Sequence, residues 1–399
     1  MRRKFLLLLI ISSCLLLCGC WDRKELSEVQ LVAGMAVDLG EDAKYKITVE
    51  GLNAIELNSQ TASGNAPSTV ESIEGDSLAE ITHQFNRYLP QSLIYSHMKV
   101  LVISEEAAKL GMLDFLDYVE RNRELRDDFK ILIAKGKAED ILKITYPFKK
   151  ASSLKISPQV DNLLGEWGGD PGVRINDFIS DLTLEGKSAV LAAVKVNGDP
   201  EKGRTMENIT KVVPDAIVEI ESLGVFKGDK LKGFMDLEAT RSYLWITNQL
   251  KQTAINIHCE GDQYSAIRIL QSNTNVDVKW ENGKPDIHVK IKSEGLLEGT
   301  QCYKTVDSVK TYRKYEKLVN TTAAKEIKNT IQKAQKEFGS DIFGFGEIFR
   351  RQHNQQFMKV KDNWNNYFAE AKVKVDYDIT IRRSGIRTES FLTKTKEER

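Results

Sequence analysis

Alternating apolar and polar residues predict β-strands along most of the chain. Between residues 44 and 52, the side chains of Tyr45, Ile47 and Val49 share one face, and Glu50 belongs to the polar face. Residues 373–381 alternate most clearly, which is typical of an antiparallel strand with one face in water. We expect further strands at residues 31–37, 97–104, 129–134, 188–196, 223–226, 231–235, 253–258, 265–271, 275–281 and 286–295.

Apolar residues three and four positions apart predict helices between these strands. One helix begins at Ser77, because Ser77 and Glu80 have the spacing of a capping box, and it ends at Pro90. We expect further helices at residues 110–119, 138–144, 175–182 and 238–250, around Trp364, and as a long segment over residues 306–338.

Changes of composition divide the chain. Residues 152–172 are rich in Ser, Gly, Pro and Asp, and they indicate a domain boundary or a long crossover. The last third is richer in strands than the region before it. We therefore predict an α+β protein with a signal segment at residues 1–19 and mixed α/β domains at residues 20–150, 151–250 and 251–399, the last with the long helix.

The N-terminus has the layout of a secretory signal. Basic residues at positions 2–4 precede an apolar run at 5–17, which is shorter than the roughly 20 residues that a transmembrane helix needs. The small residue Gly19 then precedes Cys20. This pattern predicts a bacterial lipoprotein. A diacylglycerol would modify the Cys20 thiol, cleavage would follow Gly19, and the rest of the chain would lie outside the cytoplasm, attached by lipid.

Two alternatives to this interpretation stay open. Residues 11–14 also fit a loose lipobox that ends at Cys14, but acylation there would leave the three leucines at 15–17 exposed. The segment would also serve as an unmodified signal anchor with incidental cysteines. Cys20 is the better choice of lipidation site.

Composition narrows the possible partners. The precursor has 57 basic and 57 acidic residues, and loss of the signal segment leaves 54 basic residues against 57 acidic ones. The sequence contains no basic stripe with interleaved aromatic residues, so we expect no nucleic-acid partner. Cys259 and Cys302 are the cysteines that follow Cys20, and the sequence leaves open whether they form a disulfide.

Patterns that suggest catalysis lack their partners. Residues 75–78 spell the Gly-Asp-Ser-Leu nucleophile block of GDSL hydrolases, but the late Asp-x-x-His pairing is missing and Ser77 already serves as a helix cap. Residues 344–346 lack the third glycine of a dinucleotide loop. The acidic pairs Asp127–Asp128 and Glu219 with Glu221 are interpreted as solvated edges.

Metal binding is not expected either. No two histidines have helical spacing, and the adjacent His258 and Cys259 do not form a metal-binding knuckle. The sequence therefore predicts no enzyme, and no catalytic, cofactor-binding or metal-ligating residue. The five histidines are His83, His97, His258, His288 and His353.

Four segments of the chain resemble a known family when taken in order. They are Gly19–Asp22 with Glu25 and Leu26; Tyr95–Ile103 with Glu105 and Glu106; Leu223–Leu231; and Asp341–Glu347, continuing through Asp362–Trp364 to Ile381–Gly385. Together they resemble the Ger(x)C family, the lipoprotein C subunits of GerA-type spore germinant receptors. The likeness covers essentially the whole chain after the signal.

The resemblance implies a fold and a function. The fold is three mixed α/β domains in an elongated arrangement, each with a β-sheet and packed helices. The function is that of a non-enzymatic, lipid-anchored subunit on the outer face of the spore inner membrane. Its partners would be the integral membrane A and B subunits, and no cofactor is implied. We interpret Phe226, Ile342 and Phe345 as core and residues 228–229 as a turn, so Cys20 alone is predicted as a functional residue.

Two other functions remain as alternatives. A substrate-binding lipoprotein of an ABC transporter usually has two α/β lobes with repeated βα units, whereas the last third here has an antiparallel texture. A lipid-anchored hydrolase would need a catalytic triad or a metal cluster. Because the sequence has no convergent polar pocket pattern, we expect no tight binding of a small molecule.

Overall fold

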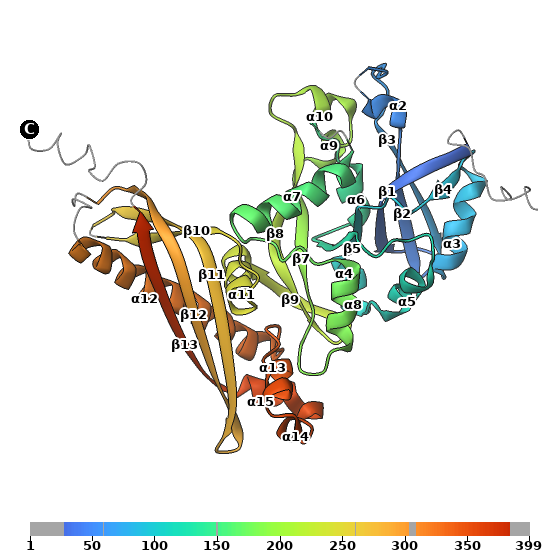
Figure 1. The fold of residues 1–399 in the computed structure, drawn as a ribbon. Helices are drawn as coiled ribbons and strands as arrows, with labels where there is room; N and C mark the ends of the chain where they lie inside the picture. The colour runs from blue at the N-terminus through green and yellow to red at the C-terminus, as the bar shows by residue number, and fades with distance from the viewer. Residues whose placement is uncertain (1–27, 59, 149–150, 260, 303–308, 384–399) are drawn as a thin grey trace, which may run out of the picture.

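Two β-sheets organise the protein, one of nine strands and one of four. The computed structural model describes residues 28–58, 60–148, 151–259, 261–302 and 309–383. Figure 1 shows that the two sheets lie toward opposite ends of an elongated molecule, with helix α11 (Leu237–Ile246) between them. The chain is thus a mixed α/β protein, as the sequence predicts. Residues 1–27, including Cys20, lie outside the described residues.

The nine-stranded sheet contains the strands that lie between residues 29 and 236. Its order is β3-β2-β1-β5-β6-β7-β8-β9, and β4 pairs with the start of β1. The central strands β1, β5, β6 and β7 are parallel, and antiparallel pairs follow at both ends. The strands are β1 (Val29–Leu39), β2 (Tyr45–Leu52), β3 (Ser68–Gly75), β4 (Ser92–Ile94), β5 (Val100–Ser104), β6 (Lys130–Ala134), β7 (Val190–Gly198), β8 (Ala216–Lys227) and β9 (Lys230–Asp236).

Helices cover both faces of this sheet. Two separate apolar cores form, one on each face, and every residue of β5 and β6 is buried. Strands buried on both faces are typical of parallel sheets. One face carries α3 (Leu78–Gln84), η2 (Phe85–Arg87), α4 (Glu105–Leu110), α5 (Leu113–Arg121) and α8 (Ile175–Thr183), and the other carries α6 (Ala138–Lys143) and α7 (Ser152–Glu166). The short helices α2 (Ala54–Leu57), α9 (Pro200–Gly203) and α10 (Met206–Thr210) complete the unit.

The four-stranded sheet has the order β10-β11-β12-β13. The long helix α12 packs along it, and its apolar core continues through α11 to β8 and β9 of the larger sheet. Its strands are β10 (Thr253–His258), β11 (Tyr264–Glu281), β12 (Lys284–Thr300) and β13 (Lys372–Arg383). Its helices are α12 (Val309–Lys333), the π-helical η3 (Ala334–Phe338), α13 (Phe345–Gln352), α14 (Asn354–Phe357), η4 (Lys361–Asn363) and α15 (Trp364–Ala369).

The number of sheets differs from the expectation of one sheet in each of three domains. Strands β7, β8 and β9, from the expected middle domain, extend the N-terminal sheet, because β7 pairs with β6 at Ile133 and Ala193. The physical reason is that β6 is buried on both faces and needs a hydrogen-bonded neighbour on each side. The boundaries near residues 150 and 250 stay a prediction.

Most predicted elements are confirmed. One segment has a different secondary structure from the prediction, and two expected strands form one continuous strand. Residues 152–166, expected within a boundary or crossover, form the α7 helix with Pro158 inside it. The strands expected at 265–271 and 275–281 form the single strand β11, because its polar middle continues to pair with β12 beyond an irregularity at Ile269 and Gln271.

Two further local predictions are wrong. Strand β13 exposes one face to water, as expected. It pairs in parallel with β12 and not antiparallel, because the chain passes through α12–α15 before it enters β13. The α3 helix begins at Leu78, with Ser77 as the residue before it, but the Ser77 side chain makes no capping hydrogen bond. The alternating pattern reports which face is covered, and it carries no information on strand direction.

Strand β2 is buried on both faces, so its polar residues have structural roles. The Glu50 carboxylate is fully buried and accepts hydrogen bonds from the backbone amides of Ser152 and Ser153, both at 2.9 Å. On β1, the Asp38 carboxylate accepts from the backbone amides of Ala138 and Glu139 at 2.7 and 2.9 Å. These two strand carboxylates therefore cap the N-termini of α7 and α6.

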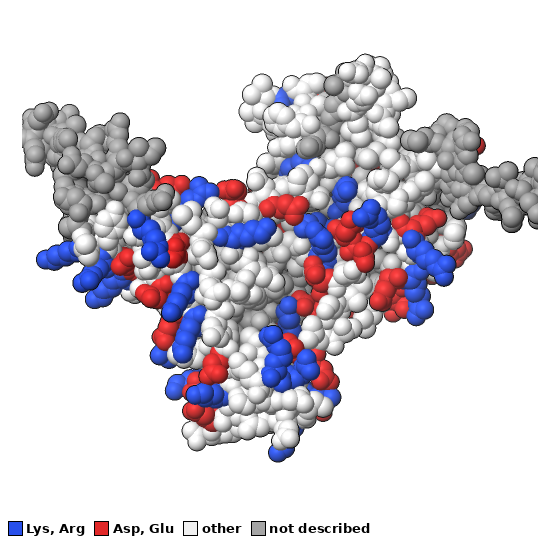
Figure 2. Space-filling view, viewed as in Figure 1, with Lys and Arg blue, Asp and Glu red and all other residues white. Residues whose placement is uncertain are grey.

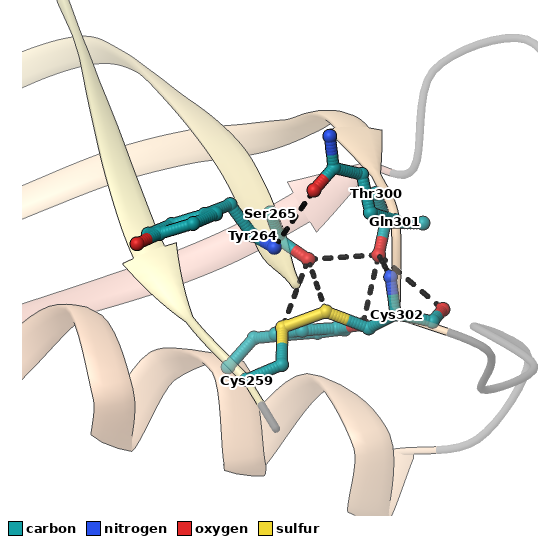
Figure 3. The surroundings of a disulfide bond; sticks show 7 residues. Cys259, Tyr264, Ser265, Thr300, Gln301 and Cys302 are labelled. Atoms are coloured by element: carbon teal, nitrogen blue, oxygen red, sulfur yellow. Dashed lines mark hydrogen bonds between the residues drawn. A yellow bond between two sulfur atoms is a disulfide. The ribbon is translucent and has the colours of Figure 1, made fainter. Parts of the chain in front are cut away.

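A disulfide joins Cys259, next to the end of β10, to Cys302, which follows β12. The two Cα atoms are 6.3 Å apart. Figure 3 shows Ser265 and Thr300 beside the two sulfur atoms, with the Ser265 hydroxyl 2.7 Å from the Thr300 hydroxyl. The structure thus resolves the cysteine question that the sequence left open, and the bond is typical of proteins outside the cytoplasm.

Candidate functional site: the Asp341 loop between the two sheets

The segment Ser340–Gly346, here called the Asp341 loop, connects the end of η3 to helix α13. Gly339 ends η3 with a left-handed φ of 56°. Ser340 and Asp341 are fully buried, and Ile342, Phe343 and Phe345 point into the core. Gly344 again has positive φ, at 76°, where it begins α13. The prediction that Ile342 and Phe345 belong to the core is confirmed.

The Asp341 carboxylate organises this loop. Its Oδ1 accepts hydrogen bonds from the backbone amides of Phe343 and Gly344 at 3.1 and 3.0 Å. Its Oδ2 accepts from the Gly346 amide and from the Trp364 indole Nε1, both at 2.8 Å. Burial raises the pKa of Asp341 to about 6, although these four donors favour the ionised carboxylate. One buried side chain thus fixes the start of α13 against α15.

The same loop joins the C-terminal part to the larger sheet. The backbone carbonyl of Asp341 accepts a 2.7 Å hydrogen bond from the Ser188 amide, two residues before β7. The backbones of Gly186 and Gly346 approach so closely that a Cβ on Gly346 would lie 2.6 Å from the Gly186 Cα. Lys361 and Glu185 form a 2.7 Å ion pair at the rim. The Asp341 loop is therefore the joint between the two sheets.

An open groove of about 710 Å³ runs beside this joint. Its walls come from the end of α8, the end of α11, the middle of β11 and helix α13. The charged residues that line it are paired: Lys187 lies 2.7 Å from Asp181, and Glu347 lies 2.6 Å from Arg350. The Asp341 carboxylate is buried behind the groove. This arrangement offers a polar surface, and it shows no nucleophile beside a base.

The residues that suggested catalysis lie apart. Ser77 stands at the start of α3 and His83 lies on that helix, His258 lies on β10 and His288 on β12, and the other two histidines lie between elements. Within the described ranges, no group of three or more His, Cys, Asp or Glu side chains has metal-binding geometry. Glu219 and Glu221 both form ion pairs with Lys195, as solvated edges do. Asp127 accepts a hydrogen bond from Asn176.

The other sequence landmarks have structural roles. Residues 100–103 form the centre of β5, buried on both faces. Phe226, on β8, is fully buried against Phe178, with ring centroids 5.1 Å apart. Gly228 turns with a φ of 60°, as predicted. The Asp229 carboxylate goes beyond the predicted turn role, because it accepts from the backbone amides of Met112 and Leu113 at the start of α5.

Family models match the chain in two consecutive parts. A "spore germination protein N-terminal domain" matches residues 22–196, and a "spore germination B3/GerAC like, C-terminal" domain matches residues 221–385. The chain belongs to the family of GerAC- and GerBC-like C subunits of spore germination proteins. The first match ends within β7 and the second begins within β8, and these two strands pair within one sheet. The family resemblance predicted from the four sequence segments is confirmed.

Similar C subunits extend over the full length of this one. The chain is 29% identical to spore germination protein KC of Bacillus subtilis (strain 168), with 100% of each chain covered. It is 26% identical to spore germination protein B3 of the same organism, over 93% of this chain and 95% of that protein. The crystal structure of the GerBC protein matches with a TM-score of 0.54 and 23% identity, covering 90% of this chain and 99% of that one, and it supports the fold.

The Asp341 loop can be recognised in the sequence, but the segments that it contacts in the fold cannot. The family resemblance marks Asp341–Glu347, and the sequence analysis predicts Ile342 and Phe345 of this segment as core. Nothing in the sequence linked it to residues 185–188, because contacts between distant segments leave no local pattern. Cys20 and residues 384–385, which carry other parts of the resemblance, lie outside the described residues. Among the described residues, none of the helices combines the length and apolar character that a membrane crossing needs.

Proposed function

We propose that this chain is a lipid-anchored subunit of a GerA-type spore germinant receptor and is needed for nutrient-triggered germination. The observation that carries the proposal is the ordered match of both family parts, over residues 22–196 and 221–385, together with similarity to germination protein KC over its full length. The anchor is the lipid on Cys20, and the location is the outer face of the spore inner membrane.

The subunit acts by contact with the integral membrane A and B subunits and turns over no substrate. Support comes from the roles that the described acidic residues have in the fold. Asp38, Glu50, Asp229 and Asp341 hold helix N-termini, and Glu219 and Glu221 pair with Lys195. These groups stabilise the elongated fold to which the partner subunits would bind.

Acylation of Cys20 is the first test. In a spore-forming host, the Cys20→Ala variant should fail to incorporate labelled fatty acid and should accumulate as the precursor, because the thiol is the acceptor. Cys18→Ala is the matched control and should be acylated normally. Lipid incorporation into Cys20→Ala, or a mature N-terminus at another residue, would contradict the assignment.

Deletion of the gene is the second test. Spores should lose the response to one set of nutrients and keep the responses that run through other receptors. The A and B subunits should also fall in abundance in the same spore membranes if the complex is interdependent. Normal germination with every nutrient, in a strain without paralogous receptors, would refute the proposal.

A solute-binding role is the alternative that calorimetry tests. The two sheets differ in strand number and in direction, unlike the two similar lobes of a transporter binding protein. We therefore expect the mature chain from residue 20 to show no micromolar binding of amino acids or sugars. Saturable heat with one nutrient germinant, lost on changing a residue of the groove beside the Asp341 loop, would revive the alternative.

A further inference from the structure

Two loop tips at one end of the larger unit expose apolar side chains. The first is the α2 loop, residues 53–67 between β2 and β3, where Ile55 is 62% exposed. The second is the α10 tip, residues 204–215 between β7 and β8, where Val212 and Val213 are 101% and 80% exposed. Figure 1 shows both tips projecting toward the same end of the molecule, away from the four-stranded sheet.

The α2 loop turns its one charged group inward. The Glu56 carboxylate is buried and accepts hydrogen bonds from the backbone amides of Ser63 and Gly64, at 3.1 and 3.0 Å, and from the Asn65 side chain at 3.1 Å. These bonds lower the pKa of Glu56 to about 2, with the Ser63 side chain as the largest cause. From residue 57 to residue 70 the sequence contains no charged residue. The outer surface of this loop is therefore uncharged.

The α10 tip also presents little uncompensated charge. Arg204 pairs with Glu201, and Lys211 pairs with Asp215 and also lies 3.9 Å from the exposed Glu207. Figure 2 shows this end almost free of charged side chains on the face in view, whereas both signs are interspersed over the rest of that face. Binding to a bilayer surface grows with the apolar area that enters the headgroup region, and charged side chains oppose that entry less where few are present.

The chain enters the structure beside the first tip. Val32 of β1 pairs with Gly51 of β2, so the start of β1 lies at the end of the sheet from which the α2 loop departs. Gln30 also donates a 2.8 Å hydrogen bond to Thr69, at the end of that loop. Cys20 is eight residues before Glu28. Eight extended residues span at most roughly 29 Å, so a lipid on Cys20 would keep this end within that distance of the bilayer.

We infer that the α2 loop and the α10 tip rest in the headgroup region of the membrane and fix the orientation of the subunit on it. The occupant is the lipid surface itself. The inference rests on the proposed lipid anchor for the position of the bilayer. The four-stranded sheet is then held away from the membrane.

Site-specific fluorescence tests this orientation independently of acylation. The mature chain, as Cys20→Ser with an N-terminal histidine tag, is bound to vesicles of phosphatidylcholine and phosphatidylglycerol that contain a nickel-chelating lipid. A polarity-sensitive dye is attached in turn to Ile55→Cys, Val212→Cys and Met358→Cys. Met358 is the matched control because it is 48% exposed and follows α14, at the opposite end in Figure 1.

Dyes at residues 55 and 212 should shift to shorter wavelength on tethering and should be quenched by lipids brominated near the headgroup, while the dye at residue 358 should not change. Adding Val213→Asp should reduce the shift at residue 212 without changing the circular dichroism spectrum. No shift at residues 55 and 212, or an equal shift at residue 358, would overturn the inference. A shift that appears only with the A and B subunits in the vesicles would also overturn it. The tag replaces the acyl chain, so these outcomes are independent of whether Cys20 is acylated in spores.

Discussion

The two sheets bury their strands in different ways. In the nine-stranded sheet, β5 and β6 are buried along their whole length between two apolar cores. In the four-stranded sheet, β13 buries Tyr377, Ile379 and Ile381 and leaves the alternate residues in water. On that wet face, Asp376 lies 2.6 Å from His288 of β12 and 2.9 Å from Lys374.

The difference shows how an acidic residue on a strand can have either of two roles. Asp38 and Glu50 alternate with apolar residues just as Asp376 does, yet helices cover both faces of β1 and β2. The carboxylates of Asp38 and Glu50 are therefore buried, and the amides at the starts of α6 and α7 satisfy them. Asp376 faces water and pairs with His288 across the strands and with Lys374 on its own strand, and such exposed pairs contribute little.

Loss of the disulfide should give the largest effect, and it should fall on the smaller sheet. A bond that closes a loop of 43 residues stabilises by about 4 kcal/mol through the entropy of the unfolded chain. The Cys259→Ser, Cys302→Ser double variant should lose about that much in urea unfolding. Hydrogen exchange should accelerate in β10–β12. Equal acceleration in β5 and β6 would show that the two sheets unfold as one unit.

Removal of the Asp341 carboxylate should have the second-largest effect on stability, because this carboxylate orders the loop that joins the two sheets. Asp341→Ala leaves three loop amides and the Trp364 indole without a buried acceptor, which costs about 3 kcal/mol or more. Asp362→Ala, an exposed change nearby, should stay within about 0.5 kcal/mol in the same urea titration. A loss below about 1 kcal/mol for Asp341→Ala would contradict the role of this carboxylate.

The pH dependence of stability should distinguish the nine-stranded sheet, which helices cover on both faces, from the four-stranded sheet, which has one face in water. Asp170, between α7 and α8, is fully buried, and burial raises its pKa to about 7. Between the unfolded pKa, near 4, and pH 7 the folded protein therefore holds a proton that the unfolded chain has lost, and stability falls as pH rises. Between pH 5 and pH 8 this group should cost about 2–3 kcal/mol.

Asp170→Asn should remove that part of the pH dependence, measured as the difference in urea midpoints between wild type and variant at each pH. Asp376→Asn is the control on the wet sheet. The Lys374 ammonium, and then His288, hold the pKa of Asp376 below its usual value, so its titration lies below this window. Identical pH profiles for wild type and Asp170→Asn would contradict the assignment to Asp170.

The smallest effect compares matched amide substitutions on the two sheets. Glu50→Gln places an amide nitrogen near the Ser152 and Ser153 amides, with the loss of at least one buried acceptor, and should cost about 1–3 kcal/mol. Asp376→Asn should cost less than about 0.5 kcal/mol, because the carboxylate is half exposed. Urea midpoints measure both changes. Equal losses would mean that burial does not separate the two roles.

Local patterns determined the elements that a short window describes. The alternation of β2 and β13, the helical spacing of α6 and α12, and the turn at Gly228 follow from side-chain period and backbone preference. The interpretation of Phe226 and Phe345 as core residues is also confirmed. The family resemblance also marked the Asp341 loop, because its residues are contiguous in the sequence.

Only the tertiary structure decided which elements meet. The sequence did not show that β7–β9 join the first sheet, that β13 runs parallel to β12, or that Glu50 caps a helix 102 residues away. It also did not link Gly346 to Gly186. The physical reason is that the spacing of apolar residues indicates whether a face of an element is covered. Which element covers it depends on contacts between distant segments. A buried carboxylate and an exposed one look alike until the helix above the strand is in place.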